Sequence, residues 1–314
     1  MRVDVHAHLY PAAYRAVMQR LGGETTQYPL GSDADAELEA RFEMMEGAGV
    51  DLQVLSVSSQ QPYFESEPKA SEAARAANDL YAEFVARYPG RFRAFAAVPL
   101  PHVDAALREL ERALDRLKML GMTIGTSVME RSAADPAFEP LWAELNRRAA
   151  VIFVHPAGLG LCSPLVRDFG LTWPVGAPFE DTMFAMHLIE RQIPIRYPNL
   201  KIIVPHFGGV MPLVLPRIDQ HSMLFMKDEA EPPSATAKRL WYDTVGHGSL
   251  EALRCAHAAF GADRLVYGSD YPFQLKEHFV RSVTYVQDAG FSAADVTKIL
   301  DTNGTRLLGL ESKK

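Results

Sequence analysis

Short apolar runs alternate with longer amphipathic segments along the whole chain. The runs are almost continuously apolar, which is typical of parallel strands that are covered on both faces. We expect eight strands, at Arg2–Val5, Leu52–Val57, Phe92–Ala97, Met122–Thr126, Val151–Val154, Lys201–Val204, Leu240–Asp243 and Leu265–Tyr267. A segment with helical spacing of apolar residues follows each strand. The pattern therefore predicts an α/β fold, a closed (β/α)8 TIM barrel that forms one domain over residues 1–314.

The predicted helices leave three connections longer than a minimal barrel needs. These connections are residues 10–34, 57–70 and 156–181, and each follows the carboxyl end of its strand. Barrel enzymes build their active sites at that end, so we expect these loop insertions to cover a substrate. The helices themselves are expected at Asp35–Glu46, Ser71–Tyr88, Val103–Leu117, Phe138–Arg148, Thr182–Arg191 and Leu250–Ala259, with two closing helices at Phe279–Asp288 and Ala293–Leu300.

Composition narrows the class of protein. The chain is 48% hydrophobic and 23% charged, with a formal net charge of -7. This balance is ordinary for a globular enzyme and argues against a nucleic-acid partner, which requires basic surface. No stretch has the length of a membrane helix, and the two cysteines, Cys162 and Cys255, are far apart. We therefore predict a cytoplasmic protein with reduced thiols and with no membrane partner.

Residues able to bind a metal ion gather at the predicted strand ends. His6 and His8 lie two residues apart on the first strand, so both point to the same face. His155, His206 and Asp270 follow the fifth, sixth and eighth strands. In a barrel all five would meet at one rim, where three histidines and a carboxylate could hold a divalent ion with an open coordination position. The pattern predicts a metal enzyme.

The five residues need not all be ligands. His6, His8, His155 and Asp270 would complete a site, which would leave His206 free to donate or accept a proton. Asp270 could also orient or deprotonate a metal-bound water. A single histidine at a strand end is more often structural, so the interpretation depends on the set. Five other histidines fall on helices or helix starts and are interpreted as structural; they are His102, His187, His221, His257 and His278.

Four segments resemble the amidohydrolase-related family that contains aminocarboxymuconate-semialdehyde decarboxylase. The segments are DVHAH at residues 4–8, FVHP at 153–156, YPNLKIIVPHFGG at 197–209 and YGSDYPF at 267–273. Residues 35–57 also look like the first helix and second strand of that family, so the resemblance spans essentially the full chain. It implies a metal-dependent barrel with His6, His8, His155 and Asp270 as ligands and His206 as the catalytic histidine.

The same resemblance implies residues that bind the substrate. Arg41 matches an arginine that holds a substrate carboxylate, and Phe169 and Trp173 match aromatic walls of the pocket. Arg217 matches an arginine that reaches the site of the neighbouring subunit, which implies a homodimer. For both arginines, a solvated or ion-paired position on a helix is the structural alternative. Phe169 and Trp173 could equally pack a loop.

Two departures from related enzymes bear on the metal. Classical binuclear amidohydrolases carry a bridging lysine at the end of strand four, whereas Lys118 precedes that strand here, which favours a single ion. Some aromatic-acid decarboxylases of the family begin with Glu-x-His, whereas this chain has His-x-His. This difference favours Zn²⁺, with Mn²⁺ as the alternative.

Three functions follow from these residues. The first is non-oxidative decarboxylation of a small unsaturated or aromatic carboxylic acid, and the second is metal-assisted hydrolysis of a lactone, amide or ester. The third is a barrel that holds metal without catalysis, which an open coordination position argues against. His247, after strand seven, is predicted to touch the substrate. Asp243, at the end of that strand, and Ser269, directly before Asp270, are candidates for supporting the ligands, and an ordinary loop role is the alternative for each.

Overall fold

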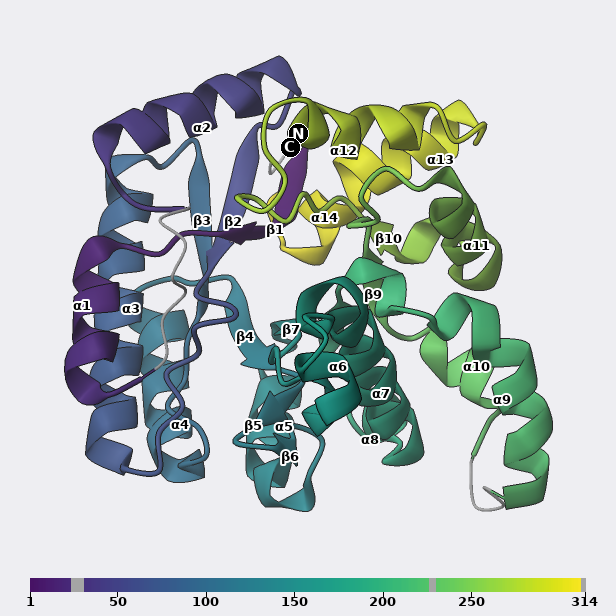
Figure 1. Ribbon diagram of the computed structural model, residues 1–314, viewed down its shortest axis with the longest axis horizontal. Helices are drawn as coiled ribbons and strands as arrows, with labels where there is room; N and C mark the ends of the chain where they lie inside the picture. Colours follow the sequence, from purple (N-terminus) through teal and green to yellow (C-terminus); the bar gives the residue numbers. More distant parts are fainter. Residues whose placement is uncertain (24–30, 226–229, 312–314) are drawn as a thin grey trace.

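The computed structural model describes residues 1–23, 31–225 and 230–311, and its centre is a sheet of eight parallel strands (Figure 1). Neighbouring strands follow the order β1-β2-β3-β4-β7-β8-β9-β10. Nearly every residue in them is buried, which explains the continuously apolar sequence. Their bounds are β1 Val3–His8, β2 Leu52–Ser56, β3 Phe92–Ala96, β4 Gly121–Gly125, β7 Val151–His155, β8 Lys201–Val204, β9 Trp241–Asp243 and β10 Leu265–Val266.

Backbone hydrogen bonds between the two ends of the sheet close it into a barrel. The amide of Val5 donates to Tyr267 O at 3.0 Å, and the amide of His8 donates to Tyr271 O at 2.7 Å. Between them, the amide of Asp270 donates to His6 O at 2.8 Å. The hydrogen bonds that close the barrel therefore include one from Asp270, a predicted metal ligand.

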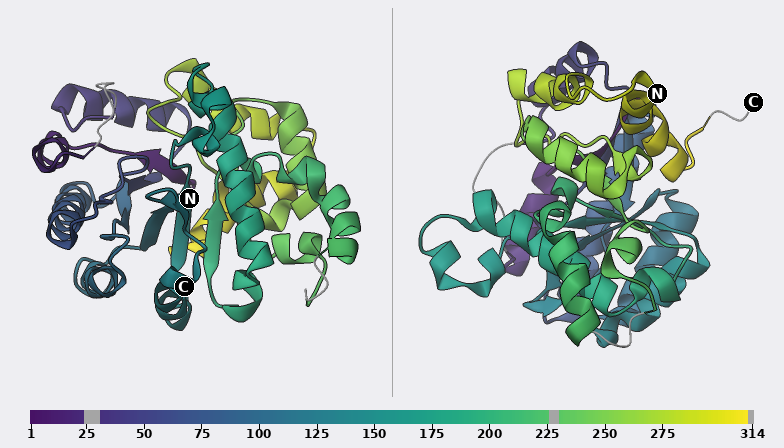
Figure 2. Two further views of the ribbon diagram at one scale, coloured as in Figure 1. Left: turned by 60° about the horizontal axis from the view of Figure 1, so that its bottom comes forward. Right: turned by 90° about the vertical axis from the view of Figure 1, so that its right-hand side faces the viewer.

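Helices surround the barrel, as the views in Figure 2 show. The main ones are α2 Asp35–Gly47, α3 Glu67–Arg87, α4 Val103–Glu111, α5 Glu139–Arg147, α7 Ala177–Glu190, α9 Met211–Phe225, α11 Leu250–Phe260 and α12 Glu277–Gln287. Shorter ones are α1 Ala12–Leu21, α6 Pro164–Arg167, α8 Ile193–Arg196, α10 Pro233–Ala237, α13 Ala293–Thr297 and α14 Asn303–Leu307. No helix among the described residues is long and apolar enough to cross a membrane.

An apolar floor lies inside the barrel beneath the strand ends. Phe95 and Phe153 stack with ring centroids 5.6 Å apart, and the ring of Phe153 lies 4.8 Å from that of His6. Leu307 and Leu308, at the C-terminal end, belong to the same buried cluster. Polar side chains at the rim are therefore separated from the amino end of the barrel by packed hydrocarbon, which lowers the local dielectric.

The structure confirms the predicted TIM barrel and differs at several boundaries. β1 runs on to His8, and α7 begins at Ala177 rather than Thr182 because Pro178 suits the first turn of a helix. Within the long connections, residues 12–21 form α1 and residues 164–167 form α6. A small hairpin, β5 Ser127–Val128 with β6 Arg131–Ser132, follows β4. Residues 24–30 of the first connection lie outside the described residues.

Candidate active site

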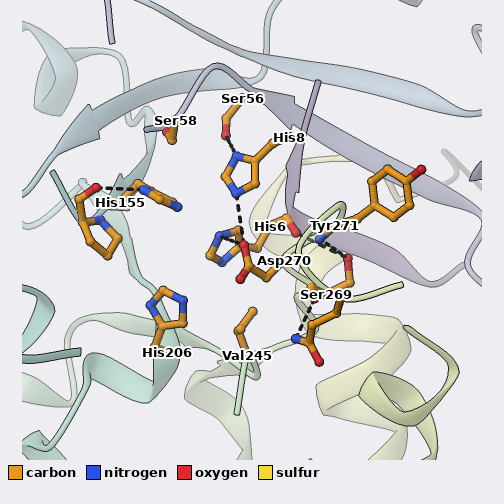
Figure 3. Close-up of polar contacts among 12 residues, drawn as sticks. His6, His8, Ser56, Ser58, His155, His206, Val245, Ser269, Asp270 and Tyr271 are labelled. Carbon is orange, nitrogen blue, oxygen red and sulfur yellow. Dashed lines mark hydrogen bonds and ion pairs between the residues drawn. The ribbon is translucent and has the colours of Figure 1, made fainter. Parts of the chain in front are cut away.

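The strand ends bring three histidines and one aspartate to a single point (Figure 3). One ligand atom from each of His6, His8, His155 and Asp270 lies within 4.8 Å of the others, and all four residues are buried. Oδ1 of Asp270 is 3.2 Å from Nε2 of both His6 and His8. The strand periodicity and the barrel closure thus place the expected ligand set together.

The outer nitrogen of each imidazole is held by the protein. Nδ1 of His6 donates to Oδ2 of Asp243 at 2.7 Å, and Nδ1 of His155 donates to Pro156 O at 2.9 Å. A carboxylate and a carbonyl oxygen only accept, so Nδ1 carries hydrogen, and in the neutral ring Nε2 then has the lone pair that a metal ion needs. For His8, the hydroxyl of Ser56 lies 3.0 Å from Nδ1 and can accept in the same way. Three Nε2 atoms therefore face the centre of the cluster.

The donor set fits one divalent metal ion. Nε2 of His6 is buried, and among the described residues no well-aligned hydrogen bond satisfies it, although Oδ1 of Asp270 lies 3.2 Å away. A cation bound between this nitrogen and that carboxylate would satisfy both. Neutral imidazoles and a carboxylate, each oriented by a second hydrogen bond, are the usual ligands of zinc and similar first-row ions.

The electrostatics of the cluster also favour a cation. Burial would lower the pKa of His6, but the carboxylates of Asp243 and Asp270 raise it to about 10. Burial lowers the pKa of His8 to about 4 and holds that of His155 well below its usual value. Although burial opposes ionisation of Asp270, His6 and His8 hold the pKa of this carboxyl well below its ordinary range. One positive charge is stabilised here, and a metal ion would supply it.

Asp4 ties the first strand to the loop that carries Asp270. Its Oδ1 accepts from the amides of His6 at 3.1 Å and Ser269 at 2.9 Å. Its Oδ2 accepts from the hydroxyl of Ser269 at 2.5 Å and from Nε2 of Gln53 at 2.8 Å. Burial raises the pKa of Asp4 to about 6, against these four hydrogen bonds. Ser269, weighed as a supporting residue, therefore acts on the site through Asp4.

His206 lies beside the cluster, with its ring centroid 5.3 Å from that of His6. Its Nδ1 donates to Oδ2 of Asp181 at 2.8 Å, and its backbone amide donates to Oδ1 of Asp243 at 2.8 Å. Burial would lower the pKa of His206, but the hydrogen bond and charge of Asp181 raise it. The residue has a left-handed backbone, φ 51°, as does Asp270 at 60°. Such strain in non-glycine residues concentrates at functional sites, where surrounding hydrogen bonds maintain it.

Arg41 is buried beneath the site, and only part of its guanidinium is bound within the protein: Nη2 has no hydrogen-bond partner among the described residues. The side chain is 1% exposed; Nε donates to Oε1 of Gln53 at 2.6 Å and Nη1 to His8 O at 2.9 Å. Its guanidinium also lies 4.4 Å from the ring centroid of Tyr271. Arg41 therefore supports the backbone beneath the site, and its contact with a substrate carboxylate stays a prediction.

Aromatic side chains flank the cluster. The ring of Trp173 lies 6.5 Å from that of His155, and it packs so closely on Gly158 that a Cβ there would lie 2.7 Å from the indole. Phe273, which the sequence did not single out, lies 5.8 Å from the ring of His8. Phe169 is 73% exposed, so within one chain it lies at the surface.

The remaining predicted residues are at the surface. His247 is exposed in the turn after β9, and partial burial lowers its pKa. Its contact with substrate stays a prediction. Arg217 is exposed on α9, on the outside of the barrel. A role for Arg217 in a second subunit remains a prediction.

Three supporting residues were missed by the sequence analysis. Asp4 shares the face of His6 and His8 through the two-residue period of the strand, so a signal was present. Ser56 ends β2, the strand paired with His8, which is a weaker signal. Asp181 gave none, because it was placed in the connection before the predicted helix.

Comparisons with known proteins identify the family of the chain. The sequence profile of a family described as Amidohydrolase matches residues 3–310. The chain is 30% identical to gamma-resorcylate decarboxylase of Rhizobium radiobacter over 88% of each protein. It is 25% identical to 2-amino-3-carboxymuconate-6-semialdehyde decarboxylase of Dictyostelium discoideum over 100% of this chain and 93% of that protein.

A solved structure has the same fold. The crystal structure of 2,6-dihydroxybenzoate decarboxylase complexed with 2,6-dihydroxybenzoate superposes with a TM-score of 0.84 at 25% identity, over 98% of this chain and 99% of that chain. The resemblance drawn from the sequence is thus confirmed, and these relatives are named as decarboxylases.

Proposed function

Because this chain belongs to the amidohydrolase family, we propose that it is a metal-dependent, non-oxidative decarboxylase of a small aromatic or unsaturated carboxylic acid. One observation carries the proposal. A histidine that is not part of the ligand cluster, His206, stands beside that cluster with Nδ1 already bound, which leaves Nε2 for proton transfer. The names of the relatives support the same chemistry.

The metal would be held by His6, His8, His155 and Asp270. We propose a single Zn²⁺, because three imidazoles and one carboxylate suit it, with Mn²⁺ as the alternative. When bound, a divalent ion supplies Lewis-acid polarisation of a substrate oxygen. Asp270 would serve as a ligand and could also accept a proton from a water molecule bound beside it.

The chain's own residues would orient the acid and deliver a proton. Trp173 and Phe273 would stack against a planar substrate, and the floor of Phe95 and Phe153 would keep water from the reacting carbon. His206 would transfer the proton on Nε2 to the carbon that bears the carboxylate. A C–H bond then forms, the C–CO₂ bond breaks, carbon dioxide leaves and its bonding electrons return to the substrate. His206 recovers its proton from solvent.

The direct experiment incubates the metal-loaded protein with a panel of acids that includes 2,6-dihydroxybenzoate and an aromatic dicarboxylate. The proposal predicts a product lighter by carbon dioxide and loss of turnover in H206Q. A product heavier by water, from a matched panel of lactones and amides, would instead identify a hydrolase. Absence of carbon dioxide release from every acid would refute the proposal.

We also propose a cytoplasmic homodimer in which Arg217 reaches the partner's site. Large apolar side chains near the barrel mouth support this, because Leu165 is 76% and Leu213 75% exposed. Light scattering should give twice the mass of the 34.8 kDa chain. Mixing inactive R217A and D270A subunits should restore activity, because one site in each mixed dimer would have both residues. A monomeric mass, or mixtures that stay inactive, would contradict the proposal.

A further inference from the structure

We propose that Asp181 is a positioning residue: it keeps hydrogen on Nδ1 of His206 in both the neutral and the protonated ring, so that Nε2 is the atom that takes up a proton and delivers it to the reacting carbon. The inference rests on the proposed decarboxylation. Oδ2 of Asp181 lies 2.8 Å from Nδ1 of His206, and the side chain of Asp181 is fully buried. A carboxylate can only accept at that position, so it selects one of the two imidazole tautomers.

The position of Asp181 is fixed by close packing between α7 and the turn after β8. A Cβ at Gly209 would lie 1.8 Å from Pro178 O, so only glycine permits this approach. Oγ1 of Thr182 lies 2.9 Å from Pro178 O and accepts from the amide of Val210 at 2.9 Å. The residue next to Asp181 thus joins the helix to the turn that carries His206.

The hydrogen bonds of Asp181 differ from those of a structural aspartate. Asp4 uses both oxygens and accepts four hydrogen bonds from three residues. Within the described parts of the chain, Oδ1 of Asp181 is buried without a partner, and Oδ2 is directed to His206. A buried carboxylate oxygen without a donor destabilises the fold, so a role in orienting His206 explains the arrangement better than a role in folding.

His206 is held from its other end as well. Its backbone amide donates to Asp243, which also accepts from Nδ1 of His6. The backbone and the ring of His206 are therefore fixed by two different carboxylates. With Asp243 holding the backbone, rotation of the ring would break its hydrogen bond to Asp181, so the orientation of Nε2 is fixed.

The test compares D181N and D181A with the wild type, all loaded with zinc, and uses D219N as the matched control. Asp219 is also an aspartate that accepts a backbone hydrogen bond, from Ser234 at 2.9 Å, but it lies on α9 outside the site. We expect D181N and D181A to lower kcat by about 100- to 10,000-fold, with KM changed less than about threefold, as when a histidine loses its orienting carboxylate. D219N should keep the wild-type kcat.

A second readout does not need a substrate. In ¹⁵N-histidine NMR spectra of the zinc-loaded protein, the signals missing from H206Q identify His206. At a pH where His206 is neutral, wild type should show hydrogen on Nδ1, and D181A should show a mixture of tautomers or the other form. If wild type releases no carbon dioxide but has the expected tautomer, the proposed function fails and the positioning role stands. If D181A folds with an unchanged tautomer, or D181N and D181A keep the wild-type kcat, the positioning role is refuted.

Discussion

Replacing Asp243 by asparagine should weaken metal binding strongly although no ligand is changed. Oδ2 of Asp243 accepts from Nδ1 of His6 at 2.7 Å. Oδ1 accepts from the backbone amides of His206 at 2.8 Å and Val245 at 3.0 Å. An asparagine side chain has one accepting oxygen and one donating nitrogen, so it cannot serve both sides. If its nitrogen faced His6, the ring proton would move to Nε2 and block the metal.

The expected magnitude follows from the role of Asp243. Loss of the group that orients a metal-bound histidine lowers metal affinity by about 10- to 100-fold. That loss corresponds to about 1.4–2.7 kcal/mol of binding free energy. A competition titration of the metal-free protein against a zinc-chelating dye at fixed pH measures it.

Ser56 offers an internal comparison. Its hydroxyl meets Nδ1 of His8 at 3.0 Å through a neutral hydrogen bond, and a charge-assisted bond is roughly twice as strong. S56A should therefore lose less affinity than D243N, with a net contribution of about 0.5–1.5 kcal/mol. Wild-type affinity in D243N, or a larger loss in S56A, would refute the reasoning.

Four further predictions concern other parts of the account. R41M should lower the free energy of unfolding in urea by about 2–5 kcal/mol, because two buried acceptors lose their donor, and should leave KM nearly unchanged. A raised KM at unchanged stability would instead show that Arg41 binds the substrate. W173A should raise KM by up to about tenfold with a smaller effect on kcat in steady-state kinetics, and an unchanged KM would remove Trp173 from the pocket. Chelation should abolish turnover and lower the melting temperature, since an ion at a thousandfold its Kd stabilises by about 4 kcal/mol; activity that survives chelation would argue against a metal enzyme. Asp181 raises the pKa of His206 against burial, so the pair stabilises the fold below about pH 6.5, and kcat should fall as the pH rises through the raised pKa. In D181N that fall in kcat should move to lower pH. An unchanged pH profile would count against the pairing.

Much of the site could be predicted because strand periodicity and barrel closure act locally and are visible in sequence. His6 and His8 are two residues apart on one strand, and His155 and Asp270 follow other strands, so their meeting required only the barrel. The same two-residue period would have placed Asp4 on the same face of β1 as His6, two residues nearer the start of the strand.

Helix residues were harder to predict because burial of one helical side chain depends on its neighbours in space. Arg41 has the sequence context of a surface arginine, yet its guanidinium lies against Tyr271 and Phe92. Asp181 fell outside the predicted helix because apolar periodicity begins only after the first turn of α7. Its partner, His206, is 25 positions away in the sequence. Such pairings come from packing between elements, which no local pattern encodes.

Anomalous diffraction from crystals of the zinc-loaded protein would test the central claim most directly. We expect one peak, with Nε2 of His6, His8 and His155 and a carboxylate oxygen of Asp270 each at about 2.0–2.2 Å. A peak held by other residues, two ions in the barrel mouth, or an Asp270 side chain turned away from the ion would contradict the account.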